Sequence, residues 1–491
     1  MFSKAVLVFA CAGIALATEF NPLHHSGPAS PYFDAPTPEH VPEATPEGCI
    51  VDQAAYIVRH GSRFPEPGSF GGWKSLFQKI QNATFTARGP LAFLPSWVPP
   101  VDDAPHEPLF LTSHGAQEAF ELGAQLRQEY GFTHGGKNFT VWAAGQQRVV
   151  DTATYFMRGY LSQGNYIGLS NENQGTVVIL PDSVNYTSAN SLTPSAACPK
   201  YSSGVNSTVV DNFHASYRSG IAKRLNEFLH GLVLDANDVG VMGDLCGFQA
   251  ALNGDTRFCN IFKDEEMLDY EYAWDLNYYY GSGPGNPFAG ATGLPWVKAV
   301  AELFGSGPNV TPANSTFAPP PLLMGFTHDN NLPPVLAALG LWNDSHTSPL
   351  SLTRPDPRRT FRSSNVVSFR GYIALERLSC EKPLSESVFH KAGVLNEVPG
   401  NSTKAAKYVR VRVSAAPIPI PGCTSGPGES CPLNSFLSHV AKREGIVGDF
   451  VKTCGLQGVK NATSVASFFT DIPKASLIGV VSADNLPQLT S

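Results

Sequence analysis

Charged side chains are scarce in this sequence. Asp, Glu, Lys and Arg make up only 15% of its 491 residues, and 41 acidic residues outnumber 34 Lys and Arg to give a formal net charge of −7. This balance argues against a nucleic-acid partner, which requires a basic face. A low charge content with an acidic balance instead favours an extracellular protein that works in acidic surroundings.

Long apolar runs are absent except near the N-terminus. Met1–Lys4 supplies a short positive start, and an apolar run of about a dozen residues follows over 5–16. This run is too short to span a bilayer, which takes about 20 residues. Ala15-Leu16-Ala17 then has the small-x-small form of a cleavage site. The sequence therefore predicts a secretory signal peptide over residues 1–17, no membrane span, and a secreted, extracellular mature protein.

Cys-x-x-Cys pairs are absent, and so is a glycine-rich nucleotide-binding loop with a lysine. We therefore expect no zinc site and no nucleotide or other cofactor. Of the nine cysteines, Cys11 leaves with the signal peptide, so eight remain. An even set in an oxidising compartment predicts disulfides, but eight cysteines allow about 105 pairings and the spacing does not select one.

Glycine and proline are abundant, with 45 and 40 residues. They predict long loops, and the chain length suggests two or three units of roughly 150 residues each. Sequons of the form Asn-x-Ser/Thr recur along the chain, and we expect several of them to carry glycans on surface loops. They lie at Asn82, Asn138, Asn185, Asn206, Asn309, Asn314, Asn343, Asn401 and Asn461.

The chain is organised around residues 54–65, AAYIVRHGSRFP. The apolar residues predict a buried strand, which the following glycine and proline end. Arg59, His60 and Arg63 then lie at the carboxyl end of this strand, where open α/β sheets bind ligands. Paired guanidinium groups match a phosphate dianion. A neutral imidazole held among such cations has an available lone pair and can attack phosphorus, so the stretch predicts phosphoryl transfer.

The pattern R-H-G-x-R-x-P resembles the signature of the histidine acid phosphatases, a branch of the phosphoglycerate-mutase-like superfamily that includes fungal acid phosphatases and phytases. Arg59, His60, Gly61, Arg63 and Pro65 all match it. Two further junctions follow in the order that the family has. A strand over 139–144 leads to Arg148, and a strand over 321–327 leads to His328 and Asp329.

The resemblance implies an α/β fold in which a phosphoglycerate-mutase-like sheet is flanked by helices and carries a mainly helical inserted domain. We expect a catalytic domain in two parts, residues 18–169 and 321–491, with the helical insertion over 170–320. Residues 18–46 are expected to form an extended arm before the first strand. The insertion carries an aromatic run over 270–280, for which packing is the favoured role over lining the pocket. His114, near a helix start, is expected to be a polar surface or supporting residue.

The resemblance also implies roles for the site residues and a disulfide pattern. His60 attacks the phosphomonoester to give a phosphohistidine, Asp329 protonates the leaving oxygen, and water then releases phosphate. The phosphate-binding residues are Arg59, Arg63, Arg148 and His328. The implied disulfides are Cys49 with Cys380, Cys198 with Cys454, Cys246 with Cys259, and Cys423 with Cys431.

The main interpretation is therefore a secreted acid phosphatase whose partner is a small-molecule phosphomonoester. The first alternative is a phytase, which shares every catalytic residue and differs in the number of cations around the pocket, for which Lys74, Lys79 and Arg88 are candidates. A secreted binding protein that has lost turnover is a further alternative. A mutase is disfavoured because secretion and the H-D acid favour hydrolysis.

Overall fold

The computed structural model describes residues 20–132, 139–161, 174–181, 188–201, 207–308, 310–311, 315, 318–342, 349–381, 405–474 and 476–482. The predicted signal peptide lies outside these residues, and so do all the sequons except Asn82 and Asn461. Both of these asparagines are exposed, as glycan attachment requires.

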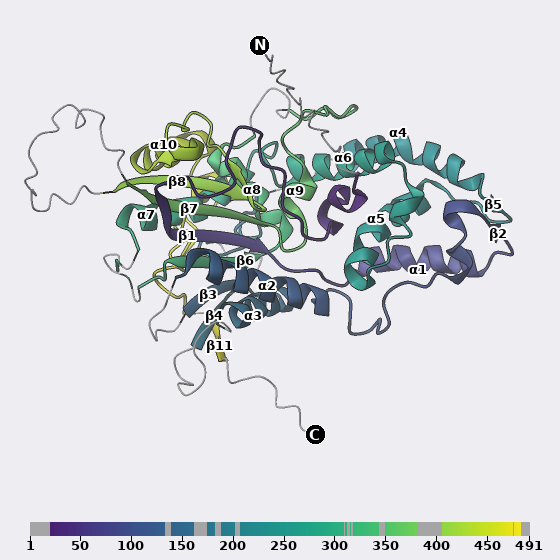
Figure 1. Cartoon of the computed structure of the whole chain (residues 1–491), viewed down its shortest axis with the longest axis horizontal. Coiled ribbons are helices and arrows are strands. Elements are labelled where there is room, and N and C mark those ends of the chain that lie inside the picture. Colours follow the sequence, from purple (N-terminus) through teal and green to yellow (C-terminus); the bar gives the residue numbers. More distant parts are fainter. Residues whose placement is uncertain are drawn as a thin grey trace, which may run out of the picture.

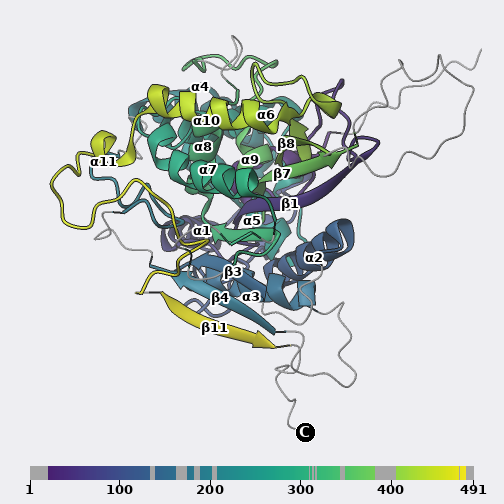
Figure 2. The same cartoon turned by 90° about the vertical axis from the view of Figure 1, so that its left-hand side faces the viewer.

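A mixed β-sheet organises one half of the molecule (Figures 1 and 2). Its strand order is β10-β8-β7-β1-β6-β3-β4-β11, with β9 paired to β8. The neighbouring strands β1, β6, β3 and β4 run parallel, whereas β7, β8 and β11 pair antiparallel with their neighbours. The strands of this sheet are β1 (Cys49–Arg59), β3 (Phe139–Ala144), β4 (Gln174–Leu180), β6 (Leu322–Thr327), β7 (Tyr372–Cys380), β8 (Ala406–Val413), β9 (Ala416–Ile418), β10 (Cys431–Pro432) and β11 (Leu477–Ser482).

Helices cover both faces of the sheet (Figure 2). One face carries α2 (Ser113–Tyr130) and α3 (Gln147–Leu161), and the other carries α7 (Ala289–Ser306), α8 (Pro333–Leu339) and α10 (Leu433–Val447). The central strands are apolar and buried along their length, as strands covered on both faces require. The fold is therefore the α/β arrangement that the sequence predicted.

A mainly helical half lies beside the sheet (Figure 1). Its helices are α1 (Pro67–Gln81), α4 (Ser207–Asn226), α5 (Ala236–Asn253) and α6 (Asp264–Gly281). The short strands β2 (Thr86–Ala87) and β5 (Leu229–His230) pair at its far end. Its apolar core includes Trp73 of α1 and Ala29 of the N-terminal arm beside side chains of α4 to α6. Segments outside residues 170–320 therefore help to build the helical half.

The N-terminal arm differs from the predicted extended segment. It contains two short 3-10 turns, η1 (Pro22–His25) and η2 (Gly27–Ala29). The Asn21 side chain caps η1 by accepting a hydrogen bond from the Leu23 N–H at 3.1 Å. A proline lies in the first turn of each, where its fixed φ is favourable.

The described residues contain four disulfides, and their pairs are those that the family resemblance implied. They join Cys49 to Cys380, Cys198 to Cys454, Cys246 to Cys259, and Cys423 to Cys431. The first links β1 to β7 at the ends of two paired strands. It therefore connects the strand that leads to the candidate site with the second half of the sheet.

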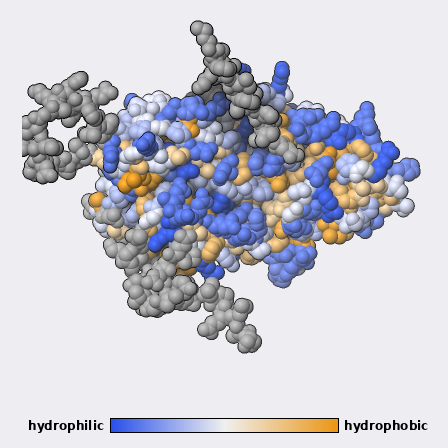
Figure 3. Space-filling view, in the orientation of Figure 1, coloured by the Kyte–Doolittle hydropathy of each residue, from blue (hydrophilic) through white to orange (hydrophobic). Residues whose placement is uncertain are grey.

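On the face of the molecule in Figure 3, hydrophilic residues are interspersed with apolar ones over both halves. Among the described residues, no helix combines the length and the apolar character needed to cross a membrane.

Candidate active site

Three parallel strands bring the predicted site residues to one edge of the sheet. In the register of β1 and β6, Arg59 is opposite Thr327, and β3 lies on the other side of β6. The residues that follow these strands therefore meet. The ring centroids of His60 and His328 lie 5.8 Å apart, and Arg148 Nη2 lies 3.4 Å from His328 Nδ1.

Side chains of α2 and α3 form hydrogen bonds to the loop after β1. Glu118 of α2 accepts hydrogen bonds from the Ser62 N–H at 2.8 Å and from the Ser62 hydroxyl at 3.0 Å. The Thr152 hydroxyl of α3 accepts one from the Gly61 N–H at 3.1 Å. A Cβ on Gly61 would lie 2.5 Å from the Gly115 carbonyl oxygen, so this close approach requires glycine.

His60 is almost fully buried and its ring is fixed. Nδ1 lies 3.0 Å from the Gly61 carbonyl oxygen, which can only accept, so Nδ1 carries the proton and the lone pair is on Nε2. Burial lowers the pKa of His60 well below its usual value, and Arg59, Arg148 and Arg63 lower it further. The imidazole is therefore neutral in mildly acidic solution and suited to nucleophilic attack.

The guanidinium of Arg59 is buried and contacted from several sides. Nη2 lies 2.9 Å from Asp329 Oδ2, and Nη1 donates to the Pro28 carbonyl at 2.6 Å and to the Val367 carbonyl. The carbon of the guanidinium lies 4.5 Å from the centroid of the Phe369 ring. The orientation of this side chain is thus determined by several independent contacts.

Arg63 and Arg148 complete a cluster of cations. Arg63 forms an ion pair with Glu66 at 2.9 Å and donates to the Phe64 carbonyl at 3.0 Å. Burial lowers the pKa of both arginines, and repulsion from a neighbouring arginine adds to the effect, so that the pKa of Arg148 is about 10. Both remain charged in acidic and neutral solution. Three mutually repelling cations in one place favour an anion such as phosphate.

Asp329 begins the turn η6 (Asp329–Asn331) after β6. Burial raises the pKa of its carboxyl, but Arg59, Arg63 and His328 outweigh that effect and the pKa lies below its usual value. Its Oδ1 accepts a hydrogen bond from the Asn330 N–H at 2.8 Å, and the Tyr278 hydroxyl is a further partner. A carboxyl in this position can exchange a proton with an oxygen bound to phosphorus.

Several supporting residues were not predicted from the sequence. Glu66 and Glu118 were given no role, and Tyr278 was predicted mainly to pack. The available signal for Thr152 was its spacing, one helical turn after Arg148, whose carbonyl accepts from the Thr152 hydroxyl at 2.7 Å. His114 is exposed and lies 3.4 Å from Glu118, which agrees with a supporting position outside the cluster.

The family model of the histidine phosphatase superfamily, branch 2, matches residues 50–414 of the chain. The chain belongs to the histidine phosphatase superfamily, branch 2. Like the enzymes of this family, it is a phosphoric monoester hydrolase, and similar proteins are named acid phosphatases and phytases.

The chain is 30% identical to the acid phosphatase PHO1 of Komagataella pastoris over 465 residues, which cover 92% of this chain and 90% of the relative. It is 29% identical to the phytase PHO112 of Candida albicans over 454 residues, 90% of this chain and 88% of the relative. The crystal structure of the phytase from D. castellii superposes with a TM-score of 0.77 at 25% identity and covers 94% of each chain.

Proposed function

We propose that this histidine phosphatase is a secreted acid phosphatase that hydrolyses small phosphomonoesters through a phosphohistidine on His60. The observation that carries the proposal is a neutral imidazole, fixed by the Gly61 carbonyl, within a cluster of three arginines. Such a group provides a nucleophile beside the charges that bind phosphate.

In the first step, Nε2 of His60 attacks phosphorus in line, and the bond from phosphorus to the leaving oxygen breaks. Arg59, Arg63, Arg148 and His328 bind the phosphate oxygens and stabilise the charge of the transition state. Asp329 donates a proton to the leaving oxygen. In the second step, water attacks the phosphohistidine, Asp329 accepts a proton from it, and phosphate is released with the imidazole restored.

The proton that Asp329 donates has a source in acidic solution. The second pKa of a phosphomonoester is about 6, so below that pH the substrate is a monoanion that carries a proton. When phosphate oxygens bind Arg59, they compete with the Asp329 carboxylate for Nη2 of that arginine, and phosphate bound at Arg63 offsets the charge that lowers the pKa of Asp329. The pKa of Asp329 then rises, and the carboxylate takes up the substrate's proton.

The surroundings of the site favour a small monoester over a polyphosphate. A cavity of about 500 Å³ opens beside α1, α4, α5 and α6, and its wall includes Asp244, Tyr270 and Trp274. Asp244 is near enough to Arg63 for the guanidinium to lower the pKa of its carboxyl, so the cavity lies near the site. Burial raises the pKa of Asp244 to about 6, so in acidic solution this wall presents a neutral carboxyl and aromatic rings, which suit a neutral or aromatic alcohol better than an additional phosphate.

The candidate cations for phytate have other partners. Lys79 forms ion pairs with Asp235 at 3.4 Å and with Asp238. Arg88 donates to the Glu227 carbonyl at 3.1 Å, and Lys74 lies over the Phe70 ring at 4.8 Å. The alternative is a phytase. It is favoured by His214 and Arg218 in the cavity wall and by the likeness to the Candida albicans and D. castellii phytases.

A rate comparison distinguishes the two activities. We expect kcat/KM at acidic pH to be at least tenfold higher for 4-nitrophenyl phosphate than for inositol hexakisphosphate, a difference of about 1.4 kcal/mol in transition-state binding. Arg218→Ala is the matched variant, and it should leave this ratio unchanged. An equal or higher kcat/KM for inositol hexakisphosphate that Arg218→Ala abolishes would establish the phytase instead.

Secretion is part of the proposal. It is supported by the signal-like N-terminus, by four disulfides, which persist in oxidising compartments, and by the exposed sequons at Asn82 and Asn461. Culture medium of cells that express the complete chain should therefore contain the activity, with a protein that begins near Thr18.

A further inference from the structure

The N-terminal arm reaches the candidate active site. Residues 20–30 lie between α5, α6 and the short helix α9 (Ser363–Val367), as the purple segment of Figure 1 shows. Ser26, Gly27, Pro28, Ala29 and Ser30 are all buried. Residues 26–30, near the start of the described chain, are thus as deeply buried as the core.

Pro28 brings this arm into contact with Arg59. Nη1 of Arg59 donates to the Pro28 carbonyl at 2.6 Å and also to the Val367 carbonyl of α9. Both carbonyls accept hydrogen bonds from Nη1, and this orientation of the guanidinium directs Nη2 to Asp329. Because the guanidinium is buried, displacement of the Pro28 carbonyl removes one of its hydrogen-bond acceptors and shifts the guanidinium towards its remaining contacts.

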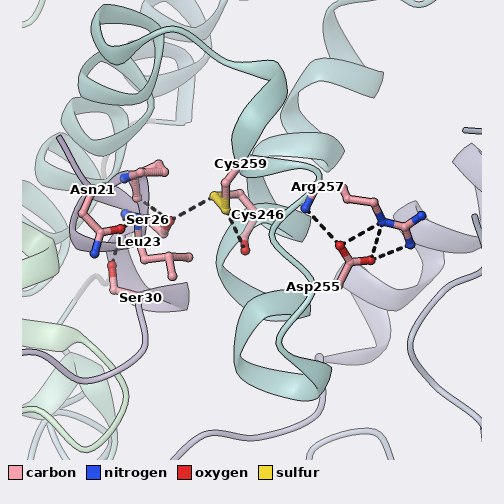
Figure 4. Close-up of a disulfide and its surroundings, with 9 residues drawn as sticks. Asn21, Leu23, Ser26, Ser30, Cys246, Asp255, Arg257 and Cys259 are labelled. Carbon is pink, nitrogen blue, oxygen red and sulfur yellow. Dashed lines mark hydrogen bonds and ion pairs between the residues drawn. A yellow bond between two sulfur atoms is a disulfide. The ribbon is translucent and has the colours of Figure 1, made fainter. Parts of the chain in front are cut away.

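Contacts on three sides hold the arm in place. The His25 ring lies 3.1 Å from the buried Glu271 of α6, and the Gly27 N–H donates to the Ser364 hydroxyl of α9 at 2.9 Å. The Ser30 carbonyl accepts from the Phe369 N–H at 2.9 Å. The Ser26 hydroxyl points towards Cys246 of α5, 3.6 Å away, in the disulfide of Figure 4.

Helix α6 anchors the second acceptor as well. Asp275 accepts hydrogen bonds from the N–H and hydroxyl of Ser363, the first residue of α9, at 2.6 and 2.7 Å. Arg359 lies 3.3 Å from Glu271, the residue that contacts His25. The arm and α9 are therefore fixed to the same helix, and each provides one carbonyl to Arg59.

We propose that residues 20–30 are a positioning element of the active site, in which the Pro28 carbonyl aligns the Arg59 guanidinium and the contacts of His25 and Gly27 keep the arm in place. The proposal rests on the proposed role of Arg59 in phosphate binding. It makes turnover dependent on a segment that begins three residues after the predicted cleavage site.

A pair of glycine variants tests this proposal. Gly27 and Gly131 have nearly the same φ, +58° and +59°, but a Cβ on Gly27 would lie 2.7 Å from Trp274, whereas a Cβ on Gly131 has no neighbour within 4 Å. Both alanine variants carry similar backbone strain, and only Gly27→Ala displaces the arm. We expect kcat on 4-nitrophenyl phosphate to fall at least tenfold in Gly27→Ala and less than twofold in Gly131→Ala.

A double-mutant cycle with Arg59→Lys shows whether the effect passes through Arg59. If it does, Gly27→Ala lowers kcat much less in the Arg59→Lys background than in the wild type. The same fold loss in both backgrounds, or a Gly27→Ala enzyme as active as Gly131→Ala, would overturn the proposal. If Gly27→Ala does not fold, His25→Ala and His25→Gln replace it, and partial rescue by Gln is expected because Gln can still donate to Glu271. Equal activity of both His25 variants with the wild type would refute the proposal.

The role of the arm and the proposed function can be tested separately. The amount of phosphoenzyme that depends on His60 tests the proposed function, and its rate of formation in Gly27→Ala tests the arm. Loss of His60 dependence refutes the first, whereas unchanged formation with His60 dependence intact refutes only the second.

Discussion

At the scale of single residues, the surroundings of His60 and Asp329 set the protonation states that a nucleophile and a general acid-base group need. Burial and three arginines lower the pKa of His60, and the same cations keep Asp329 ionised. In the free enzyme, the same surroundings therefore favour a neutral imidazole on His60 and an ionised carboxylate on Asp329. Proton transfer to Asp329 depends on phosphate binding, because only the competing phosphate oxygens release the carboxylate from Arg59.

The proposed acid role of Asp329 predicts a dependence on the leaving group. Asp329→Asn should slow phosphoenzyme formation from glycerol phosphate about 10²–10⁴-fold, the usual contribution of a general acid. Formation from 4-nitrophenyl phosphate should slow far less, because 4-nitrophenolate departs without a proton. The formation step is measured by rapid quench, since Asp329 also acts on water in the second step. Equal slowing for the two substrates would rule out Asp329 as the acid.

At the scale of elements, the site depends on a contact between α2 and the loop after β1. A Cβ on Gly115 would lie 2.1 Å from the Ser62 carbonyl oxygen and 2.7 Å from the Ser62 backbone nitrogen, and neither backbone atom can move as a flexible side chain can. The contact holds the loop that carries His60 and Arg63. Glycine at position 115 is therefore required by the packing and not by its φ.

Gly115→Ala should accordingly lower both stability and activity. We expect a loss of about 1–3 kcal/mol, the usual cost of overpacking, with a fall in kcat because the loop moves. The control is Gly71→Ala in α1, where a Cβ meets nothing within 4 Å, and which should be neutral or stabilising. Thermal unfolding and kcat are measured for both. A Gly115→Ala enzyme as stable and active as Gly71→Ala would contradict this role.

The central elements could be predicted from the sequence because each has a local signal. The strands before His60, Arg148 and His328 are apolar runs that end at polar residues, and their parallel pairing brings those residues together. Elements that depend on distant contacts could not be predicted in this way. The C-terminal tail carries no recognisable motif, yet Leu477–Ser482 forms β11, which pairs only with β4 among the described strands.

Two segments differ from their local sequence pattern because of contacts elsewhere in the fold. The sequence pattern of residues 221–234 is that of one helix, but α4 ends at Asn226. The chain then pairs with the distant strand β2 over Leu229–His230, and Gly231 follows at φ +94°. Residues 366–378 predict one strand, but the segment begins within α9, and β7 starts only at Tyr372, after Arg370 at φ +58°. In both cases, contacts with distant segments override the local pattern.

At the scale of the whole molecule, a buried carboxyl in the helical half links stability to pH. Asp244 of α5 lines the cavity and accepts a hydrogen bond from Trp73 Nε1 of α1 at 3.0 Å. Burial raises the pKa of its carboxyl to about 6. The folded state therefore favours the protonated carboxyl, and its stabilising contribution is complete below pH 4 and lost as the pH rises through about 6.

Asp244→Asn should weaken the pH dependence of stability. Asn can still accept the Trp73 hydrogen bond and does not ionise, so the variant avoids a loss of about 1–3 kcal/mol between pH 4 and pH 7. The thermal midpoints of wild type and variant are compared at both pH values. The thermal midpoint should fall further between pH 4 and pH 7 in the wild type than in the variant. An equal change in the two proteins would show that Asp244 does not titrate in this range.

The proposed function depends on His60 as the nucleophile that attacks phosphorus, and one measurement tests this role directly. Enzyme is mixed with ³²P-labelled substrate and quenched in alkali, because phosphohistidine is labile in acid, and the label on the protein is counted. The wild type should carry label that turns over with the substrate, at no more than one phosphate per chain, and His60→Ala should carry none. Label retained on His60→Ala would contradict the account and would direct the search to another nucleophile.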